Sequence, residues 1–121
     1  MTKPFQLTAF EARKLIGQKK LSSLELVKSC LSQIKKINHK VNAIVALEES
    51  EAIKQAEEAD RKTLSGEELN LLHGIPVGIK DLNMVKNLRS TSGSLLNKDH
   101  IPIDDDEIVK KIRNEGGIIF C

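Results

Sequence analysis

Residues 74–81 read GIPVGIKD, an apolar stretch that carries two glycines and ends in a charged pair. Residues 77–80 are predicted to form a buried strand, with Pro76 at its first position, where a missing N–H is tolerated. A second apolar run, residues 118–121, follows a helical segment that acids at 104–106 open and Gly116 ends. Strand, helix and strand in this order predict a parallel pair joined by a crossover. The fold class is therefore α/β.

Three further helices are predicted upstream, over residues 8–17, 22–40 and 48–62. The first two begin with capping-box spacing, because Thr8 and Ser22 each precede a glutamate by three residues. The second has the clearest apolar stripe, with residues recurring every three or four positions. Since parallel strands need cover on both faces, we expect these N-terminal helices to pack on the first strands of a parallel or mixed sheet.

The chain is predicted to be a single partial domain over residues 1–121. Residues 1–70 are expected to be mainly helical, and residues 71–121 to begin the α/β core. Residues 43–47 are predicted to form a strand or a buried connector. Because the last apolar run ends without a polar turn, we expect an incomplete fold, the N-terminal fragment of a longer domain.

Composition limits the classes of function. The 121 residues carry 19 basic and 17 acidic side chains, for a net charge of +2, and only three aromatic residues, all Phe. This near-balance argues against a nucleic-acid binder. No apolar run is long enough to cross a membrane, and Cys30 and Cys121 form neither a disulfide framework nor a metal motif. A cytoplasmic location is expected.

Lys80 is the candidate catalytic residue. It ends the predicted strand, and Gly78 leaves room for another group to approach the backbone. Partial burial would disfavour its ammonium form and allow it to act as a general base. The alternative from the residues alone is a lysine that caps a strand and reaches into solvent.

The motif around Lys80 resembles the lysine segment of the amidase signature family. The resemblance extends in order over nearly the whole chain, through residues 22–27, 34–37, 42–43, 89–94, 102–109 and 115–119. Small departures are Gly78 where alanine is common, Asn87 where glycine is common and Ser90 where threonine is common.

The resemblance implies a hydrolase of carboxylic amides with a Ser–cis-Ser–Lys triad, an amidase-signature fold and no metal or cofactor. Lys80 would accept a proton from a serine held by a cis peptide, which in turn activates the nucleophilic serine. Backbone N–H groups would stabilise the oxyanion. Both serines belong to a Gly/Ser-rich segment that the family has after the region matched here. Ser90, Ser92 and Ser94 match a loop instead, so the chain alone is predicted to be inactive.

Other candidates have structural explanations. Ser32 and Lys35 have Ser-x-x-Lys spacing but lie within a helix. The three histidines have no metal-ligand spacing, Cys30 fits a helix core, and the acids at 104–106 suit a helix N-terminus. Asp81 is predicted either to orient Lys80 or to cap a turn.

Two alternatives to a stand-alone amidase remain. The first is the A subunit of the glutamyl-tRNA amidotransferase, which would release ammonia from glutamine; His73 and Gly74, which lead into the lysine segment, and the loop around Ser94 favour the stand-alone enzymes. The second is a non-catalytic remnant or binding module. A small-molecule amide is the expected ligand, with no direct nucleic-acid contact and no membrane. A homodimer of the full-length parent is left open, and this part of the sequence does not identify the amide.

Overall fold

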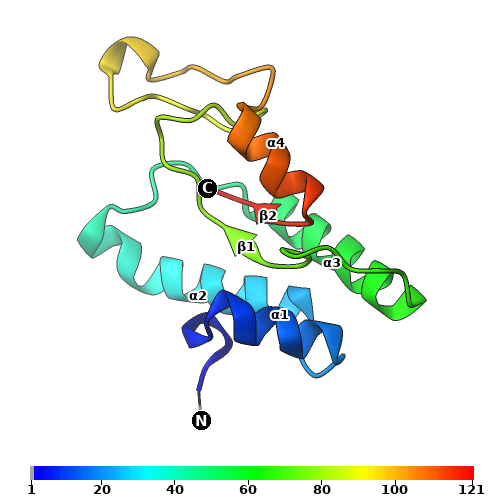
Figure 1. Ribbon diagram of the computed structural model, residues 1–121. Coiled ribbons are helices and arrows are strands. Elements are labelled where there is room, and N and C mark those ends of the chain that lie inside the picture. Colours follow the sequence, from blue (N-terminus) through cyan, green and yellow to red (C-terminus); the bar gives the residue numbers. More distant parts are fainter. Residues whose placement is uncertain (1) are drawn as a thin grey trace.

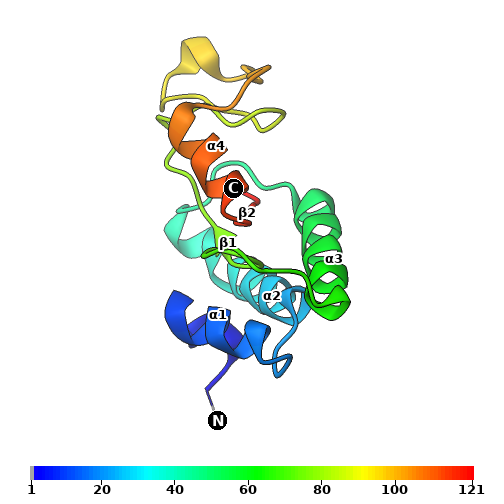
Figure 2. The ribbon, with the colours of Figure 1, turned by 45° about the vertical axis from the view of Figure 1, so that its right-hand side comes forward.

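The computed structural model describes residues 2–121. Its elements, in chain order, are η1 (Pro4–Gln6), α1 (Ala9–Gly17), α2 (Ser23–Val41), α3 (Glu49–Ser65), β1 (Pro76–Val77), η2 (Leu95–Asn97), α4 (Glu107–Asn114) and β2 (Ile118–Ile119). Helices α1 and α2 lie on one side of the strand pair and α4 on the other, with α3 alongside (Figures 1 and 2). The predicted α/β class and the helix–strand order are confirmed.

The two strands pair in parallel, as the crossover predicts. Pro76 is opposite Ile118 and Val77 is opposite Ile119. The predicted first strand over residues 77–80 was wrong in its bounds, because β1 ends at Val77 and Gly78 is exposed. The chain leaves the sheet there, although the N–H of Ile79 still donates to the carbonyl of Cys121 over 2.9 Å.

Alternation along β2 places its two side chains in different cores. Ile118 packs with the facing sides of α2 and α3, and Ile119 packs with α4 and the loop after β1. Both are almost fully buried, at 2% and 3% exposure. A third apolar cluster joins α1 and α2 to Ile75, just before β1. The expectation that the N-terminal helices pack on the strands is confirmed, and α4 covers the side that they leave.

Two glycines allow close packing of the segments that lead into β1 and β2. One lies close to α2, and the other lies where the two segments meet. Gly74 has φ +75°, and a Cβ there would lie 2.0 Å from the hydroxyl oxygen of Ser23. Gly116 has φ +85°, and a Cβ there would lie 2.8 Å from the Cα of His73. The N–H of Gly74 donates to the carbonyl of Gly116 over 3.0 Å. Both positions therefore require glycine for conformation and for space.

The capping boxes of α1 and α2 form as predicted, with the hydroxyls of Thr8 and Ser22 accepting the N–H groups of Glu11 and Glu25. Residues 43–47 form a connector without strand structure, and α3 continues to Ser65. The acids at 104–106 do not cap α4 through their side chains, since its N-cap, Asp106, makes no side-chain cap hydrogen bond. Asp105 and Asp106 bind the loop after β1 instead.

That loop folds back on itself between β1 and α4. Met84 and Asp106 pair reciprocally, because the N–H of Met84 donates to the Asp106 carboxylate (2.8 Å) and the N–H of Asp106 donates to the Met84 carbonyl (2.9 Å). Further along, the N–H of Ser90 donates to the carbonyl of His100 (3.0 Å). The loop is thus built on the start of α4, and its η2 tip projects away from α1 (Figure 1).

Asp60 on α3 binds the N-terminus of α2. Its two carboxylate oxygens accept the N–H groups of Ser23 (2.6 Å) and Leu24 (3.1 Å), which have no partner within their own helix.

We predict that Asp60→Ala lowers the free energy of unfolding by about 1–2 kcal/mol, the range of a lost N-cap. Urea denaturation measures this, with the exposed Glu57→Ala on the same helix as the control; equal effects of the two variants would contradict the prediction.

His73 is buried at 3% exposure, and its Nε2 lies 2.8 Å from the Thr63 hydroxyl and 3.1 Å from the Ala59 carbonyl. Burial, which disfavours the imidazolium, holds the pKa of His73 below its ordinary value of 6.5, and the positive charges of Arg13 and Lys62 act in the same direction.

The fold therefore favours neutral His73. The unfolded chain binds more protons below pH 6.5, so we predict that stability falls as the pH drops below 6.5 toward the folded-state pKa. The free energy of unfolding, measured from about pH 8 to about pH 5, should fall more steeply in the wild type than in His73→Gln. Parallel curves for the two proteins would show that His73 does not carry this pH dependence.

Candidate functional site

Lys80 follows β1 at a point where the backbone is held on both sides. The N–H of Ile79 donates to the Cys121 carbonyl (2.9 Å), and the carbonyl of Lys80 itself accepts the N–H of Asn83 (3.0 Å). Lys80 lines a pocket of about 170 Å³. The other walls of the pocket are the connector at residues 43–46, the loop after β1 and the end of the chain at Cys121.

The expectation that Lys80 is partly buried was wrong. The residue is exposed, and no hydrogen bond or ion pair within residues 2–121 involves its amine. The physical reason is the early end of β1: the chain has left the sheet by Gly78, so strand neighbours do not enclose Lys80. Residues 2–121 place Lys80 at a pocket and leave the residue exposed to water.

Asp81 caps a loop, which is one of the two roles predicted for it. Its carboxylate accepts the N–H of Thr91 over 2.8 Å and also the Thr91 hydroxyl. Burial acts to raise the pKa of Asp81, but the hydrogen bonds from Thr91 and from the backbone of Gly93 and Ser92 outweigh it and hold the pKa below its ordinary value. Asp81 is therefore a carboxylate whose oxygens are already engaged.

The loop serines are structural, as the sequence indicated. Ser90 is buried, and its hydroxyl donates to the Leu88 carbonyl (3.0 Å) and accepts the N–H of Val85 (3.4 Å). The hydroxyl of Ser94 accepts the N–H of Leu96 at the start of η2. Within residues 2–121, no serine is hydrogen-bonded to Lys80, so the part of the chain that the structure describes forms no Ser–Lys pair.

The connector wall of the pocket is held by side chains that sequence analysis did not assign. The Asn38 side chain donates to the Ile44 carbonyl and accepts the Ile44 N–H, each over 2.9 Å. The Arg89 guanidinium donates to the carbonyl of Val45. Asn38 lies 6 residues from Ile44, whereas Arg89 lies 44 residues from Val45. Only the first contact is local, so sequence spacing gives no signal for the second.

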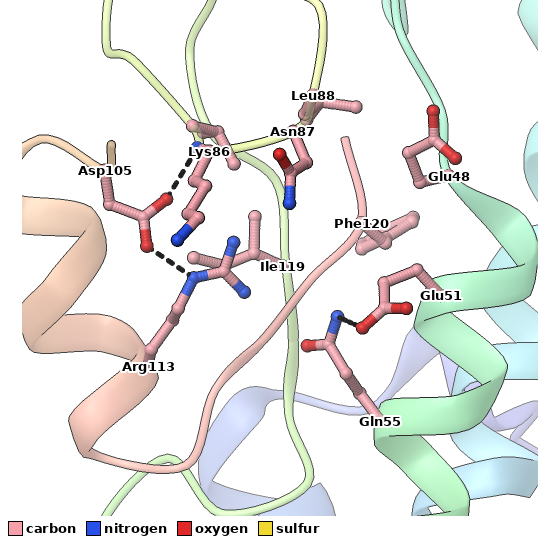
Figure 3. Close-up of a pocket in the computed structure, with 11 residues that line it drawn as sticks. Glu48, Glu51, Gln55, Lys86, Asn87, Leu88, Asp105, Arg113, Ile119 and Phe120 are labelled. Carbon is pink, nitrogen blue, oxygen red and sulfur yellow. Dashed lines mark hydrogen bonds and ion pairs between the residues drawn. The ribbon is translucent and has the colours of Figure 1, made fainter. Parts of the chain in front are cut away.

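A larger groove, of about 440 Å³, lies between α3 and α4 along β2 (Figure 3). Asp105 forms part of one wall and accepts the N–H of Lys86 (2.7 Å) and the Nε–H of Arg113 (2.8 Å). Burial acts to raise the pKa of Asp105, but these partners outweigh it and keep the pKa low. Glu51 and Gln55 of α3 stand on the opposite wall. Lys80 does not line this groove, so the smaller pocket is the candidate active site.

The remaining candidates lie elsewhere. Lys35 pairs with Glu49 over 2.7 Å, which supports a structural role for the Ser-x-x-Lys segment. His39 and His100 are exposed, and His73 packs among α3 residues. Burial raises the pKa of the half-buried Cys30 thiol. Among residues 2–121, no group of three or more His, Cys, Asp or Glu side chains is placed to hold a metal ion.

Comparison with known proteins places this arrangement in a family. The Amidase family model matches residues 25–121. The chain therefore belongs to the Amidase family. Most of its second helix, its strand pair and Lys80 lie within the matched region.

Curated relatives with 34–37% identity are A subunits of the glutamyl-tRNA(Gln) amidotransferase. The chain is 37% identical over 112 residues to the one from Clostridium botulinum (strain Eklund 17B / Type B), covering 93% of this chain and 23% of the relative. It is 34% identical over 115 residues to the one from Geobacter sp. (strain M21), covering 95% of this chain and 24% of the relative. The chain thus spans about a quarter of the length of the relatives it matches.

Solved structures agree with the fold. Native peptide amidase from Stenotrophomonas maltophilia superposes with a TM-score of 0.90 at 26% identity, covering 98% of this chain and 25% of that one. Fatty acid amide hydrolase gives a TM-score of 0.88 at 26% identity, and the match covers 99% of this chain and 22% of that one. A bacterial aryl acylamidase of the amidase signature family gives 0.86 at 25% identity, covering 94% and 24%. The described residues therefore form part of the amidase-signature fold.

Because the Lys80 side chain makes no hydrogen bond within residues 2–121, we predict that Lys80→Ala changes the free energy of unfolding by less than about 0.5 kcal/mol, as for other surface substitutions. Lys98→Ala, at an exposed loop position, is the control in urea denaturation. A loss several times larger at Lys80 would show that the residue holds the fold, and would make the variant unsuitable as a probe of function.

Proposed function

We propose that Lys80 is the proton-accepting lysine of an amide hydrolase that uses a Ser–cis-Ser–Lys triad. The observation that carries this proposal is the position of Lys80 within the matched region of the Amidase family, in the hydrogen-bonded segment that follows β1 and at a pocket. None of the other candidates combines an exposed amine or nucleophile with a pocket and a family match.

In this proposal Lys80 accepts a proton from the bridging serine, which draws the proton from the nucleophilic serine as that serine attacks the amide carbonyl. An acyl-enzyme forms, the amine or ammonia leaves, and water hydrolyses the ester. The two serines would lie outside residues 2–121, in a polypeptide as long as the family's members. This chain spans only 22–25% of the solved relatives. The contribution of residues 2–121 is the placement of the base.

The exposure of Lys80 fits an active site that is completed by additional chain. Val45, on the connector wall of the Lys80 pocket, is 53% exposed and offers an apolar surface beside the lysine. Along the groove, the N–H and C=O of Ile119 point away from β1, because the N–H of Ile118 bonds to Ile75 on the β1 side and backbone groups alternate along a strand. A further strand beside β2 would satisfy these groups.

A second candidate is the A subunit of a glutamyl-tRNA amidotransferase, which would release ammonia from glutamine. The identity of 37% to such a subunit over 93% of this chain favours it. One of the two features that favoured a stand-alone enzyme loses its weight, because His73 and Gly74 pack at the start of β1 and do not line the Lys80 pocket. Glutamine hydrolysis that rises when partner subunits are added would favour the amidotransferase, whereas hydrolysis of simple amides by a family-length chain without partners would favour a stand-alone amidase.

We also propose a small-molecule amide as the ligand, a cytoplasmic location, and self-association of a family-length chain as a homodimer. The location is supported by the thiols of Cys30 and Cys121, which are both free and would stay reduced there. None of the helices in residues 2–121 combines the length and apolar character needed to cross a membrane.

We predict that residues 1–121 alone do not hydrolyse amides, whereas an amidase-length polypeptide that carries them does. In that polypeptide Lys80→Ala should lower kcat/KM by about 10²–10⁴-fold, the usual contribution of a positioned general base. Ammonia release from glutamine and from simple amides is the measurement, and Lys98→Ala is the control.

Two results would contradict this proposal. Hydrolysis by residues 1–121 that Lys80→Ala abolishes would show that the described residues contain the whole catalytic machinery. An amidase-length polypeptide that folds but hydrolyses no amide would favour the non-catalytic alternative.

A further inference from the structure

Asp81, the residue after Lys80, is hydrogen-bonded to a residue ten positions further along the chain. The carboxylate of Asp81 accepts both the N–H and the hydroxyl of Thr91, and the Thr91 hydroxyl oxygen also accepts the N–H of Gly93 over 3.2 Å. We call the contact between Asp81 and Thr91 the Asp81–Thr91 latch.

The backbone turns directly after Thr91, where Ser92 has φ +52° and Gly93 has φ +68°. The N–H of Gly93 donates to the Thr91 hydroxyl oxygen, and that hydroxyl donates to the Asp81 carboxylate. The turn after Thr91 thus holds the hydroxyl that binds Asp81.

The latch is coupled to the core on one side and to Lys80 on the other. It closes the base of a loop whose interior residues Val85 and Leu88 are buried at 3% and 6% exposure and pack with Ile119 of β2. Immediately before Asp81, Ile79 bonds to Cys121 and the Lys80 carbonyl bonds to Asn83. Lys80 therefore lies between the hydrogen bond from Ile79 to Cys121 on one side and the Asp81–Thr91 latch on the other.

We propose that Asp81 and Thr91 are positioning residues that hold the Lys80 backbone at the mouth of its pocket. This inference rests on the proposed function, in which Lys80 is the proton acceptor. Asp81 acts through the backbone rather than as a charge partner, because its two oxygens accept from Thr91 and no ion pair within residues 2–121 joins it to Lys80.

The test is amide hydrogen exchange by NMR on residues 1–121. Asp81→Ala should speed exchange at Ile79 and Asn83, on either side of Lys80, by about tenfold or more, while α2 amides such as that of Leu31 stay unchanged. Asp99→Ala makes the same chemical change at an exposed position of the same loop and should change none of these rates.

A second pair of variants separates positioning from simple turn capping. Thr91→Val removes the hydroxyl and should speed exchange at Ile79 and Asn83, whereas Thr91→Ser keeps the hydroxyl and should restore wild-type rates there. Faster exchange confined to Thr91, Ser92 and Gly93 would overturn the proposal, since the latch would then hold only its own turn. If Asp81→Ala unfolds the whole chain, the Thr91 pair decides by the same criterion.

Activity adds a readout that a purely structural contact would not move. In an active amidase-length polypeptide, Thr91→Val should lower kcat about tenfold or more with little change in KM, and Thr91→Ser should recover it, because base placement affects the chemical step. Unchanged kcat in Thr91→Val would overturn the proposal. Absence of amide hydrolysis in the wild type would overturn the proposed function instead, while the exchange result, which does not depend on catalysis, would still support the latch.

Discussion

The parallel pairing of β1 with β2 is the contact on which the rest of the structure depends. Each strand has only two residues, so the ladder alone contributes few hydrogen bonds, and the register must be set by what surrounds it. Gly74 and Gly116 set the register at one end, because they let the segments before β1 and β2 meet. Ser23 and His73 pack where Cβ atoms on these two glycines would lie. Ile118 and Ile119 set it from the other end by filling different cores. Moving the register by one residue would exchange these two cores.

The elements that sequence analysis predicted well are those encoded locally. Capping boxes at Thr8 and Ser22 lie within a few residues of what they cap, and both formed. The order of apolar runs was enough to predict the parallel crossover. Asp105 and Asp106 show the limit of local reasoning, because acids before a helix suggest a dipole effect, whereas here they accept N–H groups from residues 86 and 84. No pattern in the sequence marks such distant partners.

At the candidate site too, some features could be predicted from the sequence and others are visible only in the structure. Lys80 was identified by its resemblance to a family segment, and its exposure contradicts the burial that the surrounding apolar residues suggested. The residues that shape its surroundings, Arg89 and the latch pair Asp81 and Thr91, act through contacts that only the folded chain creates. Asp81 was predicted either to orient Lys80 or to cap a turn; its hydrogen bonds cap the loop, and in the proposed latch the same contact holds the Lys80 backbone. Sequence therefore located the proposed base, and structure identified what holds its backbone.

Placement of the proposed base and its removal from water are separate requirements, and within residues 2–121 Lys80 is exposed. A lysine accepts a proton only when neutral, and removal from water is the usual means by which a protein favours that form. The Lys80 carbonyl accepts the N–H of Asn83, and the N–H of the preceding residue, Ile79, donates to the Cys121 carbonyl. In the proposed enzyme, the segment that brings the serines would also exclude water from the amine. Such a division would keep the amine from being activated before its serine partner is in place, because the same segment would supply both.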